Sequence, residues 1–169
     1  MAPNPRETAF EDLAREVGPM ALAIARRMLG NEEHARDAVQ EAFLNAYRAL
    51  PGFRGEAQMR TWFIRIVINC CRRQRGLWMK LNRLLSYGDP AVENAPAPYA
   101  GLPDPGLAAR IQAGVDRLPH RQRTAFVLRY GEELSLEEIS AIMECPVQTV
   151  KSNLFKAVEK MRLHLGPEV

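Results

Sequence analysis

Apolar residues recur at spacings of three and four along much of the chain, a period that is typical of amphipathic helices. One such run extends from Phe10 to Met28, and Gly18 and Pro19 within it predict a kink. A second run follows Asn31, whose side chain is suited to cap the N-terminus of a helix. The stripe expected to be buried on this second helix comprises Ala35, Val39, Ala42, Phe43, Ala46, Tyr47 and Leu50.

A third helical run begins near Met59, after Pro51 and Gly52 end the second one. No segment alternates apolar and polar residues with a period of two between hairpin turns, so strands are not expected. The pattern therefore predicts an all-α protein. The apolar face of the third helix is expected to hold Met59, Trp62, Phe63, Ile66 and Cys70.

A proline-rich segment divides the chain into two parts. Residues 89–106 contain five prolines and three acidic residues but no basic one. Proline fixes φ and removes a backbone donor, so we expect an extended, flexible linker rather than a helix or a sheet. The sequence thus predicts two small helical domains, residues 7–87 and 108–166, joined by a Pro-rich flexible linker over residues 88–107.

The C-terminal part has the spacing of a helix-turn-helix. Ser135 and Glu138 stand three residues apart, as in a capping box, and open a short helix. A tight turn at residues 144–146 separates it from a longer helix that runs from about Gln148 to His164. Polar groups and one aromatic residue cover the outer face of this longer helix, which suits a groove of DNA. That face carries Gln148, Lys151, Ser152, Phe155 and Glu159.

The distribution of charge is more informative than its sum, because 23 basic and 20 acidic residues leave a net charge of only +3. Residues 60–88 contain seven basic residues and no acidic one. Like charges without a counter-charge repel one another, so this cluster favours a nucleic-acid partner over a merely solvated face. Trp62, Phe63 and Trp78 are interleaved with it. For Trp62, core packing and stacking on a base remain equally open.

Several classes of function lack support in the sequence. Three cysteines exclude a disulfide framework, and the adjacent Cys70 and Cys71 are interpreted as packing thiols. No metal-ligand spacing, phosphate-binding glycine loop or acid–base pair is present, so we expect no metal, no cofactor and no enzymatic activity. No apolar run reaches the about 18 residues of a membrane span, and residues 1–16 lack the order of a signal peptide. We therefore expect a cytoplasmic protein without direct membrane insertion.

One face of the second helix carries a continuous exposed line opposite the stripe expected to be buried. A solvated face and a partner-binding face are both open interpretations, since single exposed apolar residues are common. The line comprises Asp37, Gln40, Glu41, Leu44 and Arg48.

Two blocks of the sequence resemble a known family. Residues 37–69 are similar to regions 2.2 to 2.4 of the extracytoplasmic-function (group IV) sigma factors of bacterial RNA polymerase, and residues 118–157 are similar to their region 4. The resemblance implies a helical region 2 bundle and a region 4 helix-turn-helix, which direct core polymerase to promoter DNA. It also implies control by an anti-sigma factor, which could hold the protein at the membrane when it is not acting at the nucleoid.

The resemblance further implies roles for individual residues. The β′ clamp helices and the β flap of the polymerase core are the expected partners. Clamp binding is implied for Asp37, Gln40, Glu41 and Leu44. Recognition and melting of the −10 element are implied for Phe53, Arg54, Arg60, Trp62, Asn69, Arg72 and Arg73. Recognition of the −35 element is implied for Gln148, Thr149, Lys151, Ser152, Phe155 and Lys156.

The sequence departs from the family pattern at two positions. Arg73 stands where relatives often have an acidic residue, and Cys145 stands in a turn that commonly contains glycine. The alternative function is that of a stand-alone helix-turn-helix regulator that binds operator DNA as a dimer. Such a regulator would bind duplex DNA tightly alone, whereas a sigma factor would need core polymerase.

Overall fold

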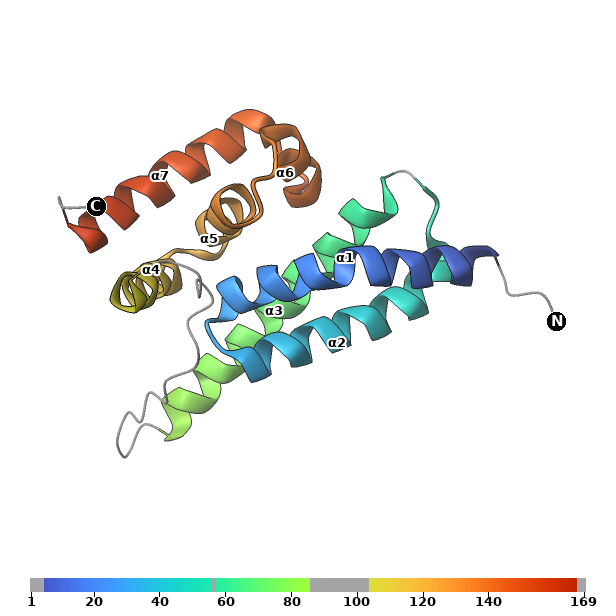
Figure 1. Cartoon of the computed structure of the whole chain (residues 1–169), viewed down its shortest axis with the longest axis horizontal. Coiled ribbons are helices and arrows are strands. Elements are labelled where there is room, and N and C mark those ends of the chain that lie inside the picture. Colours follow the sequence, from blue (N-terminus) through green and yellow to red (C-terminus); the bar gives the residue numbers. More distant parts are fainter. Residues whose placement is uncertain (1–4, 56, 86–103, 167–169) are drawn as a thin grey trace.

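The computed structural model describes residues 5–55, 57–85 and 104–166, and within these ranges every regular element is helical (Figure 1). The first two ranges form the N-terminal bundle and the third forms the C-terminal bundle. The N-terminal bundle consists of α1 (Pro5–Leu29), α2 (Glu32–Ala49), the short 3-10 turn η1 (Leu50–Gly52) and α3 (Met59–Leu85). The C-terminal bundle consists of α4 (Pro105–Arg117), α5 (His120–Phe126), the π-helical turn η2 (Val127–Gly131), α6 (Leu136–Met143) and α7 (Val147–Leu165). The predicted all-α class is confirmed.

The predicted caps are present, and α1 passes through its proline as one helix. Asn31 accepts a hydrogen bond from the backbone N–H of His34, which starts α2. Ser135 and Glu138 form both hydrogen bonds of a capping box at the start of α6. Pro19 lies inside α1 at an exposed position, so the carbonyl that loses its donor there can be hydrated.

The C-terminal boundary of the predicted linker is wrong by three residues, because residues 105–107 belong to α4. Pro105 and Gly106 form the first turn of α4, and the side chain of Asp104 accepts a hydrogen bond from the Gly106 N–H at 2.8 Å. Proline fits the first turn of a helix, because its missing N–H would have no intrahelical partner there. Residues 88–103 of the predicted linker lie outside the described residues.

The N-terminal bundle is built around a cluster of aromatic rings. Phe63 of α3 is fully buried, and its ring centroid lies 4.7 Å from that of Phe43 and 6.4 Å from that of Phe10. Tyr47 was expected in the buried stripe of α2, but it is 57% exposed. Its ring meets the edge of this cluster at Phe10, 6.4 Å away, because the polar tip of tyrosine favours the surface. The aromatic core fixes α2 and α3 against α1, so their opposite faces point outward.

The C-terminal bundle depends on a buried arginine. The guanidinium of Arg123 in α5 donates to the carbonyl oxygens of Val115, Asp116 and Leu118 at 3.0, 2.9 and 2.7 Å. These carbonyls belong to the end of α4, where a helix leaves its last acceptors without intrahelical donors. Burial lowers the pKa of Arg123 to about 10, so it remains charged at neutral pH. Against this frame, α7 buries Val150, Leu154, Ala157 and Met161, which lie opposite the polar face that its sequence predicted.

The two bundles pack directly on each other in this structure (Figure 1). Helix α4 and the turn η2 contact α1, while α6 contacts α3. The buried apolar residues of the two bundles form one contiguous cluster. The relative placement of the bundles therefore comes from side-chain packing as well as from the chain connection.

Arg123→Ala is expected to destabilise the protein by about 3 kcal/mol, because it removes three buried hydrogen bonds from a charged donor to the end of α4. The exposed neighbour Arg121 provides the matched control, and Arg121→Ala should change stability by less than about 0.5 kcal/mol. Urea unfolding followed by circular dichroism measures both values. Equal midpoints for the two variants would show that Arg123 does not anchor the end of α4.

Candidate nucleic-acid interface

The turn between α6 and α7 has the geometry of a helix-turn-helix, with one unexpected residue. Glu144 takes the left-handed conformation at the end of α6, with φ 51° and ψ 48°. Glycine adopts this left-handed conformation with the least strain, and here Glu144, rather than Cys145, occupies the position that favours glycine. Cys145 instead accepts a hydrogen bond from the hydroxyl of Ser140 at 2.6 Å through its backbone carbonyl. The turn leads directly into α7.

The predicted base-reading face of α7 is available to solvent. Gln148, Lys151, Ser152 and Lys156 are exposed, and Thr149 is half-buried near the start of the helix. Neither lysine forms an ion pair with any described residue. An exposed helix face with unpaired lysines and short polar side chains can contact both phosphates and base edges.

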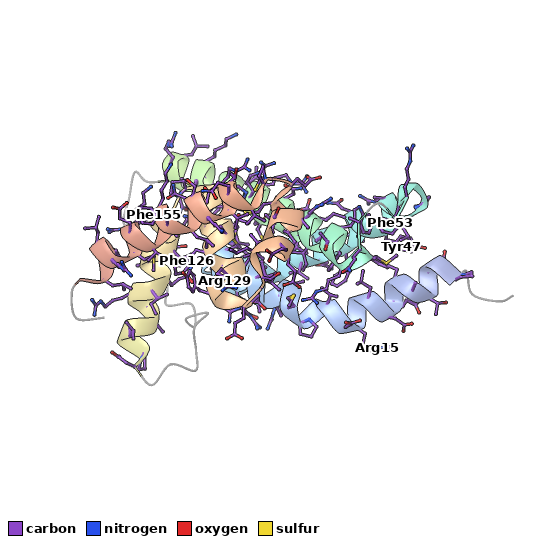
Figure 2. All side chains as sticks on the ribbon, turned by 90° about the horizontal axis from the view of Figure 1, so that it is seen from above. Arg15, Tyr47, Phe53, Phe126, Arg129 and Phe155 are labelled. Carbon is purple, nitrogen blue, oxygen red and sulfur yellow. The ribbon has the colours of Figure 1, made fainter. Side chains whose placement is uncertain are left out.

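Phe155 occupies the border between this face and an apolar groove. Its side chain is 71% exposed and points outward from α7 (Figure 2). The groove has a volume of about 920 Å³, and the sequence analysis did not identify it. The groove could not be predicted from the sequence, because Tyr130 and α7 are far apart along the chain and meet only in the folded structure. Its lining includes Tyr130, Leu154, Phe155, Val158, Arg162 and Leu163.

The middle of α3 presents a basic surface that faces α5 and α6 across a narrow cleft. The cleft has a volume of about 220 Å³, and Asn69 and Arg72 line it on the side of α3. His120 and Arg121 line the opposite side. Burial, together with the positive charges of Arg72, Arg123 and Arg121, lowers the pKa of His120 to about 4. His120 is therefore neutral at physiological pH, and the positive potential of the cleft comes from arginine.

The basic cluster of residues 60–88 has counter-charges that the sequence segment does not contain. Arg73 pairs with Glu41 of α2. Two further arginines pair with residues of the C-terminal bundle: Arg65 with Glu144 and Arg75 with Asp116, each at 3.3 Å. The expectation of an unpaired cluster is thus wrong for these three arginines, because the fold brings acidic residues from other elements. Arg72, in contrast, forms no ion pair with any described residue.

The loop before α3 presents aromatic and basic side chains at the far end of the N-terminal bundle from α7 (Figure 2). Phe53 and Trp62 are half-buried, with ring centroids 4.9 Å apart, so Trp62 combines partial core packing with an accessible edge. Arg54 is exposed. Arg60 is half-buried and donates to the sulfur of Met20 at 3.5 Å, so it lies against α1 rather than extending into solvent.

The outer face of α2 lies open to solvent. Asp37 and Gln40 are exposed, and Leu44 is 53% exposed although it is apolar. Glu41 is half-buried by its ion pair with Arg73, which links this face to α3. The exposed line that the sequence predicted is present, and Glu41 joins it to the basic surface of α3.

The described part of the chain was compared with the requirements of a metal site and of a reactive thiol. It contains no group of three or more His, Cys, Asp or Glu residues that could hold a metal ion. Cys70 and Cys71 are free and buried, and burial raises both pKa values, that of Cys71 to about 12. A buried thiol that stays protonated is unreactive, which fits the interpretation as packing residues. None of the described helices is long and apolar enough to cross a membrane.

Comparison with known protein families identifies both bundles. Residues 13–76 match the family model "Sigma-70 region 2", and residues 108–161 match "Sigma-70, region 4". The RNA polymerase sigma-H factor of Pseudomonas aeruginosa is 33% identical over 168 residues, which cover 94% of this chain and 87% of that protein. The ECF RNA polymerase sigma-E factor of Escherichia coli is 37% identical over 142 residues, which cover 78% of this chain and 73% of that protein.

Solved structures show the same fold. The sigma factor RpoE in complex with the anti-sigma factor NepR from Bartonella quintana superposes with a TM-score of 0.72, at 22% identity, over 95% of this chain and 99% of that one. CnrH in complex with the cytosolic domain of CnrY gives a TM-score of 0.68, at 24% identity, over 96% and 91% of the two chains. With a region 2 bundle, a region 4 helix-turn-helix and relatives that match along nearly its whole length, this chain belongs to the extracytoplasmic-function sigma factors of the sigma-70 family, which serve RNA polymerase.

Proposed function

We propose that this sigma factor divides promoter recognition between its two bundles. Residues 7–87 bind core polymerase and recognise and melt the −10 element, residues 104–166 bind the −35 element, and the segment between them links the two. The observation that carries this proposal is the solvent-exposed polar face of α7, the second helix of the helix-turn-helix, which holds two lysines without an ion pair to any described residue. Polymerase performs the chemistry, because sigma factors are not enzymes.

The exposed face of α2 is our candidate for the contact with the β′ clamp helices. Leu44 is a large apolar residue at the surface, with the polar Gln40 one turn before it and Asp37 two turns before it. An apolar residue ringed by polar groups is typical of the centre of a small protein–protein contact. Glu41 forms an ion pair with Arg73, so we assign it a smaller contribution to clamp binding than Leu44.

The basic face of α3 and the loop before it are our candidates for the −10 element. Asn69 and Arg72 are exposed on α3 and suit the backbone of the duplex edge, since arginine contacts phosphates without sequence preference. The adjacent rings of Phe53 and Trp62, which are tilted at 45° to each other, suit a base that has left the duplex stack. Arg54 is exposed beside them, whereas Arg60 and Arg73 are already engaged within the protein and carry less of the proposal.

The N-terminal half of α7 is our candidate for reading the −35 element in the major groove. Gln148, Thr149 and Ser152 can form hydrogen bonds with base edges, while Lys151 and Lys156 suit phosphates. Phe155 lies beside them and offers an apolar contact to a thymine methyl group or to the groove beside α7. The apolar groove at Phe155 and Leu163 is our candidate for the contact with the β flap.

We also infer that an anti-sigma factor controls this protein in the cytoplasm. The sigma factor RpoE of Bartonella quintana, which has the same fold, was solved in complex with the anti-sigma factor NepR, which supports such a partner for this chain. Exposed apolar residues on α2 and α7 offer surfaces that a partner could cover. An anti-sigma factor there would compete with the polymerase.

Binding to promoter DNA is expected to depend on core polymerase. The alternative of a stand-alone dimeric regulator conflicts with membership of a family that serves RNA polymerase. Reconstituted holoenzyme should protect both promoter elements in footprinting and open the start-site region to permanganate, whereas the free protein should do neither at the same concentration. Tight, sequence-specific operator binding by the free protein would contradict the proposed function.

Gln40→Ala combined with Leu44→Ala is expected to weaken binding to core polymerase about tenfold or more, as truncation of a central contact does. The double variant Glu11→Ala with Arg15→Ala removes two exposed side chains from α1 and is the matched control. Fluorescence anisotropy of labelled protein, titrated with core polymerase, gives the affinities. Unchanged affinity of the α2 variant with unchanged helix content would remove α2 from the interface.

Lys156→Ala is expected to weaken binding to all −35 sequences alike and to lower the salt slope by about one unit, because a phosphate contact releases a counterion. Ser152→Ala with Gln148→Ala should instead change the order of preference among −35 variants, with roughly 1–3 kcal/mol for each lost base contact. Holoenzyme binding to a panel of −35 variants at several salt concentrations separates the two effects. An unchanged order for the Ser152 and Gln148 double variant would show that this face does not read bases.

A further inference from the structure

The last two turns of α3 extend beyond the helices that pack against the rest of it. Helix α3 has 27 residues, whereas its antiparallel neighbour α2 has 18. The ring of Trp78 lies 5.9 Å from that of His34, which is in the first turn of α2. The residues of α3 after Trp78 therefore pass the start of α2, and Figure 1 shows this light-green end projecting past α1 and α2.

This projecting end keeps the apolar side that the body of α3 buries. Every seventh residue lies on nearly the same side of a helix, because seven residues make almost two turns. Such a series in α3 runs through Phe63, Cys70, Leu77 and Leu84. Phe63 and Cys70 are buried, but Leu77 and Leu84 are 58% and 77% exposed. Leu81 lies on the same side, and the apolar stripe of the core thus continues where no described helix covers it.

The exposed apolar residues of the protein are concentrated at this end of α3. Five of the ten large apolar side chains that are exposed in the described ranges lie within residues 77–84. Single exposed leucines are common on protein surfaces, but a continuous apolar side marks a site of interaction. We call Leu77, Leu81 and Leu84 the overhang leucines.

Basic side chains cover the rest of the same turns. Residues 72–85 contain five basic residues and no acidic one. Lys80 and Arg83 are exposed, and neither forms an ion pair with any described residue. At 100° per residue, Lys80 flanks the overhang leucines and Arg83 lies on the far side of the helix. A leucine face with a neighbouring tryptophan and a lysine- and arginine-bearing polar face is typical of helices that lie in a membrane surface.

The size and the charge of this end of α3 distinguish between possible occupants. The overhang leucines span about 10 Å along the helix axis, so another protein helix would meet only about two turns. A stable protein interface buries about 800 Å² on each partner, which is more than one side of two turns supplies. A second copy would also bring the same positive charges close together. A bilayer surface has no such minimum area, and its anionic headgroups complement the cations.

We propose that the end of α3 is a peripheral membrane anchor, which inserts the overhang leucines at the acyl boundary of a bilayer and binds anionic phospholipid headgroups. Trp78 is 44% exposed beside the leucines and suits the level of the headgroups. A helix with its side chains is only about 10 Å wide, close to the Debye length of about 8 Å at physiological salt, so Arg83 also experiences the negative surface. The helix lies in the plane of the surface and does not span it.

The fluorescence of Trp78 reports on this contact directly. The chain has two tryptophans, so Trp62→Phe leaves Trp78 as the single fluorophore. We expect vesicles of phosphatidylglycerol to shift its emission to the blue, because the ring leaves water. Vesicles of phosphatidylcholine should bind at least tenfold more weakly, since they offer no net negative charge. An unshifted emission with saturating phosphatidylglycerol vesicles would overturn the proposal.

Two pairs of substitutions separate the apolar and the electrostatic contributions. Leu81→Ser with Leu84→Ser should lower partitioning to phosphatidylglycerol vesicles at least tenfold, because two exposed leucines no longer leave water. Leu44→Ser is the matched control for vesicle binding, since Leu44 and Leu81 are 53% and 52% exposed in the same bundle. Co-sedimentation of the full chain with vesicles measures the partitioning, and circular dichroism checks that helix content is retained.

Lys80→Gln with Arg83→Gln should lower partitioning to phosphatidylglycerol vesicles about tenfold and leave that to phosphatidylcholine unchanged. Arg15→Gln with Arg48→Gln removes two exposed cations elsewhere in the N-terminal bundle and is the matched control.

Three results would contradict the anchor: equal partitioning of the wild type to both lipids, unchanged partitioning of the leucine variant, or a loss in the control variants as large as in the test variants. A wild-type dimer that the leucine variant abolishes in sedimentation velocity, without vesicle binding, would assign the overhang leucines to a second copy and overturn the anchor. The assays contain neither polymerase nor DNA. They therefore decide the membrane contact independently of the proposed promoter recognition.

Discussion

Each helix of this protein has a narrow apolar stripe, and the fold follows from the need to bury these stripes against one another. In the N-terminal bundle Phe63 is fully buried against Phe10 and Phe43. In the C-terminal bundle α7 buries its stripe on a frame that Arg123 holds at the end of α4. With one face of each helix committed to the core, the other face carries the polar and basic residues proposed to bind polymerase and DNA.

The same kind of packing also joins the two bundles. Sequence-distant residues such as Arg27 and Glu132 complete a shared interface, and the buried apolar residues of both bundles form one cluster. Apolar packing and ion pairs therefore both set the relative placement of the bundles.

Local features of the fold were predictable from the sequence, whereas contacts between distant segments were not. The helical period, the capping box at Ser135 and the stripe of α7 depend on neighbouring residues only. The start of α4 was assigned to the linker because Pro105 resembles its neighbours, although proline also suits a helix start. The counter-charges Glu41 and Asp116 come from other elements, so the apparent excess of positive charge on α3 was overestimated.

The central claim, that α3 and α7 of one molecule serve two separate promoter elements, is tested most directly by site-specific photocrosslinking. A crosslinker placed at Arg72 and another placed at Ser152 would each be mapped on the same promoter in complex with holoenzyme. The account predicts crosslinks from position 72 at the upstream edge of the −10 element and from position 152 within the −35 element. Crosslinks from both positions to the same DNA segment, or from neither position to DNA, would contradict it.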